Sequence, residues 1–308
     1  VQHHSASGER CLALHSHGNA RFSTPTFIPP DAIQMPGYTL MASPTLYSGQ
    51  RVQARLSADK AIKTYLYLGY YDANDNVEIL RGPEYVLPAG KSCEVEWIIP
   101  DLRGMPIAEI GLETPEAGSI YLDYLTWNGT PETTFTRPSG SVLPFPGPKI
   151  WHKAWVDGVD QWEDRWREPF RIIQNEGRGL ISTGTWEWKD YQAQAEITPV
   201  LIKSGGIAVR VQGMRRFYAL LLCSDGKLRL VKALEGDHLL AEVDFPWTEY
   251  KPNQLKVQAQ GNRISGWVGK NKLIEVNDTN EPLTEGGIGL VIEEGHLMCT
   301  AVEVGPIR

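Results

Sequence analysis

The sequence lacks the patterns that mark the common enzyme classes, and it has few cysteines. It contains no GxSxG nucleophile elbow, no HExxH zinc motif and no glycine-rich phosphate loop between a strand and a helix. The cysteines are far apart and form no CxxC pair, which argues against a zinc knot or a redox pair. Three disulfide pairings remain open, but we expect four mostly buried thiols, because each lies in or beside a strand pattern: Cys11, Cys93, Cys223 and Cys299.

Long apolar runs and an excess of basic residues are also missing. No run of 18 apolar residues occurs, so we expect no membrane span. The formal net charge is -7 at pH 7, whereas proteins that bind nucleic acid need a basic face. The first residues, VQHHSASGERC, have neither the apolar core nor the cleavage site of a signal peptide. The sequence therefore predicts no nucleic-acid partner and no membrane span, and it leaves the compartment open.

Turn-forming and aromatic residues are abundant. The 308 residues include 30 Gly, 21 Pro and 10 Trp, which indicates many turns and few long helices. Apolar and polar residues alternate with period two in short runs bounded by Gly, Pro, Asn and Asp, as in half-buried strands. We predict strands at 9–16, 51–57, 62–71, 92–99, 106–113, 119–127, 178–184, 190–198, 206–212, 216–223, 227–233, 239–244, 254–260, 263–269, 272–276, 287–293 and 297–304.

Strand patterns stop in the middle of the chain and then resume. The stretch NGTPETTFTRPSGSVLPFPGPK, 128–149, is rich in Pro, Gly, Ser and Thr and is typical of a linker. We therefore predict an all-β chain of two tandem β-sandwiches of jelly-roll type. The first covers 1–135, a linker covers 136–149, and the second covers 150–308.

A polar face is expected in the stretch GGIAVRVQGMRRFYALLLCSDGK, 205–227. Asp225 and Gly226 suit a two-residue hairpin turn, because both tolerate positive φ. Pairing outward from that turn places Cys223 and Leu221 on the drier face, toward the core, and Tyr218 on a mixed face. Straight alternation likewise places Arg210 on the outward side of its strand. We expect the two side chains to share a partly wet, concave surface.

Planar rings beside amide and guanidinium groups suit sugar recognition. The apolar face of a pyranose stacks on a ring, while the polar groups bond its hydroxyls. The alternative is that the aromatic residues are core packing units. The candidate ligand-binding residues are Gln192, Gln194, Arg210, Gln212 and Tyr218, with Trp186, Trp188 and Trp267 as stacking platforms.

The first half resembles the jelly-roll carbohydrate-binding modules. The resemblance lies in GSIYLDYLTWNG, 118–129, following SGQRVQARLSA, 48–58. It implies a structural Ca²⁺ held by oxygen ligands near both chain ends, with Asp123 at the position of the strand-borne aspartate and Glu9 as its partner. The alternative is that Asp123 satisfies a neighbouring backbone turn.

The second half resembles concanavalin-like and laminin-G-like sandwiches through GGIAVRVQGMRRFYALLL, 205–222, and LTEGGIGLVIEEG, 283–295. The same pattern occurs in the sandwich of 3-keto-disaccharide hydrolase-like proteins. The whole chain is similar to the C-terminal half of bacterial ADP-ribosylglycohydrolase family proteins, as in PFRIIQNEGRGL, 169–180. The activity of that family belongs to an all-helical domain with paired magnesium ions. No part of this chain matches that domain, so the resemblance implies an upstream catalytic domain and transfers no catalytic residue.

Three functions remain open on the sequence. The first is a non-catalytic region of a larger hydrolase that binds carbohydrate. The second is a scaffold that contacts the missing catalytic domain or a second copy, in which case the aromatic face should be flat and apolar. The third is a glycoside hydrolase or lyase that uses Glu196, which would need a second carboxylate roughly 5–10 Å away.

Overall fold

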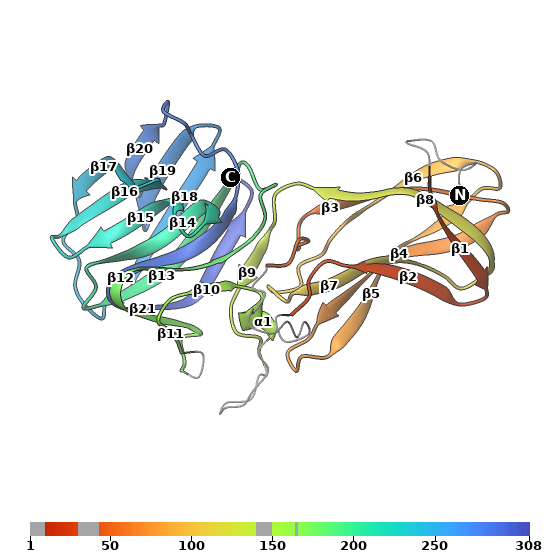
Figure 1. The fold of residues 1–308 in the computed structure, drawn as a ribbon, viewed down its shortest axis with the longest axis horizontal. Helices are drawn as coiled ribbons and strands as arrows, with labels where there is room; N and C mark the ends of the chain where they lie inside the picture. Colours follow the sequence, from red (N-terminus) through yellow and green to blue (C-terminus); the bar gives the residue numbers. More distant parts are fainter. Residues whose placement is uncertain (1–9, 30–42, 140–149, 164–165) are drawn as a thin grey trace.

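The computed structural model covers the 308 residues and describes 10–29, 43–139, 150–163 and 166–308. Within these ranges the chain is all-β, as predicted, and its two sandwiches lie side by side along the long axis of the molecule (Figure 1). The one helix among the described residues is α1, Ile150–Lys153. No helix in the described ranges is long and apolar enough to cross a membrane.

The first sandwich consists of two antiparallel four-stranded sheets. Their strand orders are β1-β8-β3-β6 and β2-β7-β4-β5. The alternating apolar residues of these strands enclose a core that includes Leu56, Leu68 and Ile110. The strands are β1 (Leu12–His17), β2 (Ala20–Pro25), β3 (Arg51–Ala58), β4 (Ile62–Tyr71), β5 (Val77–Leu87), β6 (Ser92–Ile98), β7 (Ile107–Thr114) and β8 (Ala117–Asn128).

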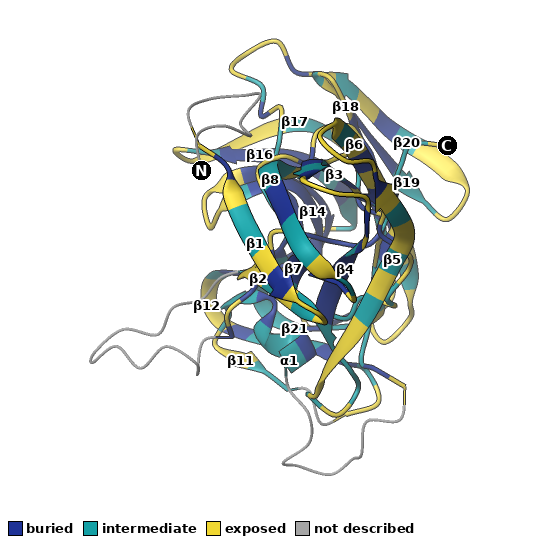
Figure 2. Cartoon of the chain, turned by 90° about the vertical axis from the view of Figure 1, so that its right-hand side faces the viewer, coloured by how far each residue is buried: buried dark blue, intermediate teal, exposed yellow. Residues whose placement is uncertain are grey.

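Sequence periodicity did not reveal the two strands β2 and β5, which lie at sheet edges. Most residues of β5 are exposed, so an alternation of apolar and polar residues is weak there (Figure 2). Pro83 also falls inside β5. An edge strand tolerates proline because one side of its backbone needs no hydrogen bond, and the β4–β5 register shifts at this point.

The second sandwich is built around one composite sheet that folds over itself. Its main path is β17-β16-β15-β14-β21-β13-β18-β19-β20, and β12 and β9 also pair with β21. The strands are β9 (Thr133–Phe135), β10 (Val156–Gly158), β11 (Gln161–Trp162), β12 (Phe170–Thr183), β13 (Tyr191–Val200), β14 (Ser204–Gly213), β15 (Arg216–Cys223), β16 (Lys227–Leu234), β17 (Asp237–Asp244), β18 (Asn253–Gln260), β19 (Arg263–Val268), β20 (Asn271–Asn277) and β21 (Gly287–Gly305).

Strand β21 passes from one layer of the second sandwich to the other. Its first half pairs with β14, and its second half pairs with β13. The change of layer occurs at Glu294 and Gly295, which both have positive φ. A Cβ at Gly295 would stand 2.3 Å from the carbonyl oxygen of Leu201, so only glycine fits there. This bend explains why the sequence predicts two separate strands where the structure has one.

Strand β9 belongs to the second sandwich, although the predicted bounds place Thr133–Phe135 at the end of the first. Thr133–Phe135 pairs with Val302–Val304 of β21 and covers an otherwise open stretch of that strand. The segment between β8 and β9 therefore crosses from one sandwich to the other. Residues 140–149 of the predicted linker lie outside the described residues.

The junction between the sandwiches is a buried aromatic contact centred on Tyr47. This side chain precedes β3 but packs into the core of the second sandwich, with ring centroids 4.8 Å from Trp188 and 6.1 Å from Phe135. Its hydroxyl lies 3.1 Å from Thr183 Oγ1 and accepts a hydrogen bond from Gly184 N at 3.0 Å. Since Thr183 Oγ1 donates to Ala154 O, the Tyr47 hydroxyl donates to Thr183. Burial raises the pKa of Tyr47, which keeps the hydroxyl protonated.

We predict that Tyr47→Phe lowers the free energy of unfolding by about 1–3 kcal/mol, because the Gly184 N–H is left buried without an acceptor. Urea unfolding followed by tryptophan fluorescence measures this change. Tyr250→Phe is the control, since Tyr250 is 66% exposed. A loss at Tyr47 no larger than that of the control would show that the hydroxyl does not hold the junction.

Candidate functional site

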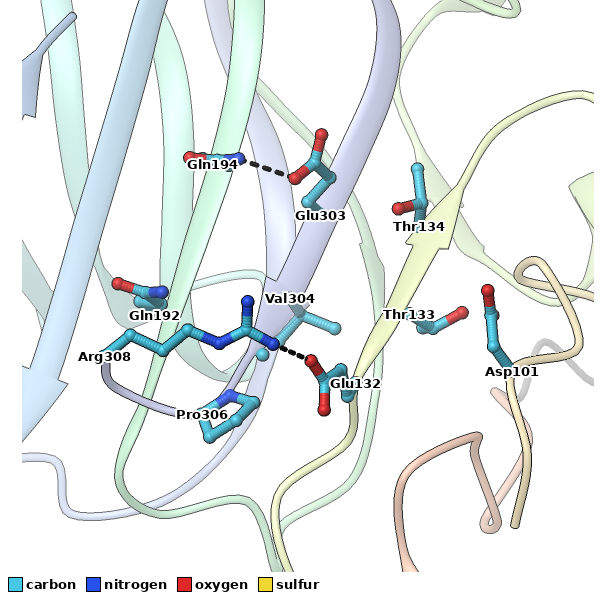
Figure 3. A pocket seen from close by; sticks show the side chains of 11 residues that line it. Asp101, Glu132, Thr133, Thr134, Gln192, Gln194, Glu303, Val304, Pro306 and Arg308 are labelled. Carbon is cyan, nitrogen blue, oxygen red and sulfur yellow. Dashed lines mark hydrogen bonds and ion pairs between the residues drawn. The ribbon is translucent and has the colours of Figure 1, made fainter.

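A polar groove of about 380 Å³ lies where the two sandwiches meet. Figure 3 shows its walls, which come from the loop after β6, from the segment around β9, from β13 and from the end of β21. Most of the lining residues have a side chain that carries oxygen or nitrogen. The lining residues are Asp101, Glu132, Thr133, Thr134, Gln192, Gln194, Glu303, Val304, Gly305, Pro306 and Arg308.

Two of the predicted ligand-binding residues, Gln192 and Gln194, stand in this groove. They alternate along β13 with the core residues Tyr191, Ala193 and Ala195, so both amides project from the outer face of the sheet. Gln194 is directly opposite Glu303 of β21, and its Nε2 donates to Glu303 Oε2 at 2.5 Å. The alternation seen in the sequence is sufficient to place these two amides.

The charges of the groove are partly paired. Arg308 forms an ion pair with Glu132, and both side chains are largely exposed. The Asp101 carboxylate accepts a hydrogen bond from the backbone of Arg103 at 2.8 Å, which shapes the loop that forms the opposite wall. Among the described residues, no group of the protein bonds the amide of Gln192. That amide is therefore open to a ligand.

A second cavity of about 610 Å³ adjoins the groove. Asp101 and Thr134 line both spaces, so the groove continues along the first sandwich past these two residues. The added walls include the half-exposed ring of Tyr70 and are otherwise of mixed character: Asp72, Ala73, Leu102, Arg103, Met105, Thr136, Arg137, Pro138 and Ser139. Together the two spaces are lined by residues from both sandwiches.

The prediction that Arg210 faces solvent is wrong. Its side chain is 0% exposed, because Arg210 has φ 51° and forms a β-bulge in β14 that turns it out of the alternating pattern. The guanidinium donates to Gly261 O at 2.5 Å and to Leu283 O at 2.6 Å, and it lies 3.3 Å from Asp190 Oδ1. Burial lowers the pKa of Arg210, and these partners offset the loss of water.

Tyr218 is also buried, and its predicted place on a wet face is wrong. The β15–β16 loop has three residues, so Cys223 pairs with Lys227 and the register is one residue away from the predicted two-residue turn. In this register Leu228 and Leu230 of β16, and not Arg229, share the face of Tyr218, and that apolar face belongs to the main core. Its hydroxyl donates to Asp278 Oδ2 at 2.6 Å and accepts from Leu283 N at 3.0 Å.

The remaining candidates occupy different surroundings. Trp188 is 0% exposed and is a core residue, so its predicted role as a stacking platform is wrong. Gln212 is half-buried and donates to Glu285 O at 2.8 Å. Trp267 lies half-exposed on the outer face, where Lys256 Nζ is 4.3 Å from its ring centroid and covers part of the ring. Trp186 is 55% exposed and lines a separate cleft.

The calcium prediction at Asp123 and Glu9 stays a prediction. Asp123 is the extra residue of a bulge in β8, between Leu122 and Tyr124, which pair with successive residues of β3. Glu9 lies outside the described residues. Within the described ranges, the His, Cys, Asp and Glu side chains form no group of three or more that could hold a metal ion.

Sequence reasoning missed the groove residues Asp101, Thr134 and Glu303. They are far apart in the chain, and only the crossing of the chain between the sandwiches brings them together. The alternation in TAVEVG, 300–305, does carry a usable signal, because it places Glu303 outward between the buried Val302 and Val304.

We predict a loss of stability at acid pH from the buried pair of Lys232 Nζ and Asp278 Oδ2, 2.8 Å apart and each 3% exposed. Burial acts to raise the pKa of Asp278, but hydrogen bonds from Lys232 and Tyr218 lower it overall. A folded-state pKa below the unfolded value of about 3.9 gives stability that is present above that pH and lost as pH falls through the folded pKa. Urea unfolding between pH 7 and pH 3 measures it.

Asp278→Asn is expected to lower the free energy of unfolding at pH 7 by about 3–5 kcal/mol, because Lys232 is left as an unpaired buried charge. The free energy of unfolding of this variant should also change less between pH 7 and pH 3 than that of the unmodified chain. The exposed Asp244→Asn serves as the matched control. If both variants lose the same amount of unfolding free energy at acid pH, Asp278 is not the cause of that loss.

Comparisons with known proteins give weak likenesses only. No family model matches the sequence, and no curated protein matches it. The carbohydrate-binding module CBM66 from Bacillus subtilis is 18% identical, with TM-score 0.45, covering 49% of this chain and 94% of that one. A Bacillus subtilis protein of unknown function with a galectin-like fold is 16% identical, with TM-score 0.41, covering 51% and 91%. A GH43 protein from Bacillus licheniformis is 12% identical, with TM-score 0.37, covering 54% and 38%.

Proposed function

We propose that this chain binds carbohydrate in the polar groove between its sandwiches and does so without cleaving it. The observation that carries the proposal is the pair of neighbouring amides, Gln192 and Gln194, beside the Glu303 carboxylate in an open groove. Geometry of the groove, rather than the weak likeness to a carbohydrate-binding module, supports this function.

Sugar hydroxyls need partners that both donate and accept hydrogen bonds. Each glutamine amide offers two donor hydrogens and an acceptor oxygen, and an ionised carboxylate offers acceptors only. The free amide of Gln192 and the remaining oxygen of Glu303 supply both kinds of group on one wall. Thr134 and Asp101 add a hydroxyl and a carboxylate on the other wall. A wall that offers both donors and acceptors suits a ligand with neighbouring hydroxyls, as on a sugar ring, better than a ligand with a single ionic group.

Binding without cleavage fits the state of the carboxylates. Glycosidases commonly use two carboxyl groups, one as an acid and one as a base or nucleophile. In the groove, Glu132 is paired with Arg308, Glu303 accepts from Gln194, and Asp101 accepts from the backbone of Arg103. Glu196, the carboxylate that the sequence favours for a hydrolase, is exposed and does not line the groove.

In the larger protein, the chain would act as an accessory region that holds a glycan-bearing target near a catalytic domain. This part of the proposal depends on the sequence similarity to the C-terminal half of bacterial ADP-ribosylglycohydrolase family proteins. The catalytic step would belong to an upstream helical domain, and this chain would contribute affinity and position. A structural Ca²⁺ at Asp123 and Glu9 would then stabilise the first sandwich.

We predict that Gln192→Ala and Gln194→Ala each weaken glycan binding about 3- to 10-fold, since each removes hydrogen bonds worth about 0.5–1.5 kcal/mol net. A glycan array screened with the whole chain identifies a ligand, and isothermal titration calorimetry then gives the Kd of each variant. Gln254→Ala is the matched control, because Gln254 is exposed on β18 outside the groove.

Three outcomes decide among the functions. Selective binding that both groove variants weaken and the control leaves unchanged supports the proposal. An absence of binding to every glycan on the array would contradict it and favour a scaffold role. Release of reducing sugar from a bound glycan would favour a glycoside hydrolase, and Glu303→Gln would then be the first variant to assay.

A further inference from the structure

A second cleft, of about 620 Å³, lies at the junction and shares no lining residue with the polar groove. The crossing segment between β8 and β9 separates the two spaces, with Asn128–Thr130 lining this cleft and Glu132–Thr134 lining the groove. Each sandwich contributes one tryptophan to the cleft, Trp127 and Trp186. The other lining residues are Asn128, Gly129, Thr130, Glu187, Lys189, Asp190 and Glu285.

The two tryptophans are presented differently. Trp127 is half-buried at the end of β8, and its Nε1 donates to Thr45 O at 2.8 Å, which fixes the orientation of the indole. Trp186 lies in the turn between β12 and β13 and is 55% exposed. Two residues later, Trp188 is fully buried against Tyr47. The buried Trp188 anchors the turn, and the exposed ring of Trp186 is thereby held at the cleft.

The floor of the cleft is tied to buried groups. Thr130 Oγ1 donates to Asp190 O at 3.2 Å and so joins the crossing segment to the second sandwich. Asp190 Oδ1 accepts from Gly261 N at 2.8 Å and lies 3.3 Å from Arg210 Nη2. Because Arg210 is wholly buried, it holds this wall from behind. The cleft is therefore a formed feature of the junction and not a gap between independent loops.

The polar groups near the two indole rings include a positive charge, a negative charge and an amide, from Lys189, Glu285 and Asn128. Lys189 Nζ and Glu285 Oε2 are 4.0 Å apart, a loose pair in which both groups keep hydrogen-bonding capacity. Asn128 is exposed and makes one long contact, at 3.5 Å, with Gln53. An exposed aromatic face beside donors and acceptors of this kind suits a ligand with one apolar face and a polar edge.

We propose that this cleft is a stacking subsite for a hexopyranose, in which the Trp186 indole packs against the apolar C–H face of the sugar ring. Asn128, Lys189 and Glu285 bond the hydroxyls at its edge. The proposal depends on the carbohydrate-binding function stated above and adds to it a second site of different character. The groove recognises hydroxyls with amides and lacks an indole, whereas the cleft supplies the aromatic surface. Two sites on one rigid junction would also strengthen binding of a multivalent glycan.

Fluorine NMR of the whole chain labelled with 5-fluorotryptophan tests the subsite directly. The Trp186 and Trp267 resonances are assigned with Trp186→Phe and Trp267→Phe. The probes are methyl hexopyranosides, followed by the best glycan from the array. We expect addition of sugar to shift the Trp186 resonance and to leave the Trp267 resonance, on the outer face, in place. The Trp186 shift should persist in Gln192→Ala, because the two sites share no residue.

Isothermal titration calorimetry with the same sugars measures how each tryptophan contributes to the Kd. Trp186→Ala should weaken binding about tenfold, the size expected for loss of one aromatic stacking contact, while Trp267→Ala should leave the Kd unchanged. If a sugar binds and Gln192→Ala weakens that binding while the Trp186 resonance does not move, the subsite is wrong and the proposed function stands. If no sugar produces heat or shifts any resonance, both proposals are wrong.

Discussion

The docking of Tyr47 into the second sandwich is the interaction on which the rest of the structure depends. A side chain from the first sandwich fills a place in the core of the second, between Trp188 and Phe135, and its hydroxyl is bonded on both sides. Two sandwiches joined only by exposed chain would move independently. With Tyr47 buried in the second core, the residues of both sandwiches that line the groove and the cleft are held next to one another.

Polar groups buried at one end of the second sandwich complete this arrangement. Arg210 donates to carbonyl groups in three loops, those of Lys189, Gly261 and Leu283, and supports Asp190 behind the tryptophan cleft. Tyr218 and Lys232 converge on Asp278 in the same region. Buried polar groups of this kind are costly unless every partner is present, so they fix the loops in one arrangement. Arg210 and Tyr218, which the sequence suggests as ligand-binding residues, are thus buried and hold the surface loops in place.

The crossing segment between β8 and β9 separates two surfaces with complementary chemistry. On one side, amides and carboxylates face an open groove, and on the other side an exposed indole faces a cleft. Carbohydrates present both polar hydroxyls and apolar ring faces, so the two surfaces together match both properties of one class of ligand. Residues of both sandwiches line the groove and the cleft, so neither sandwich alone forms either space.

The sequence by itself determined the all-β class, most strands and the outward projection of Gln192 and Gln194, because period-two alternation is a local property of each strand. It could not determine the faces of Arg210 and Tyr218. A bulge at Arg210 turns that side chain out of the alternating pattern. The three-residue loop after Cys223 brings Leu228 and Leu230, in place of Arg229, onto the face of Tyr218, so that face is apolar core. Only the tertiary structure decided that Asp101, Thr134, Gln192 and Glu303 share a groove. Their proximity depends on the docking of one sandwich against the other, which no local pattern encodes.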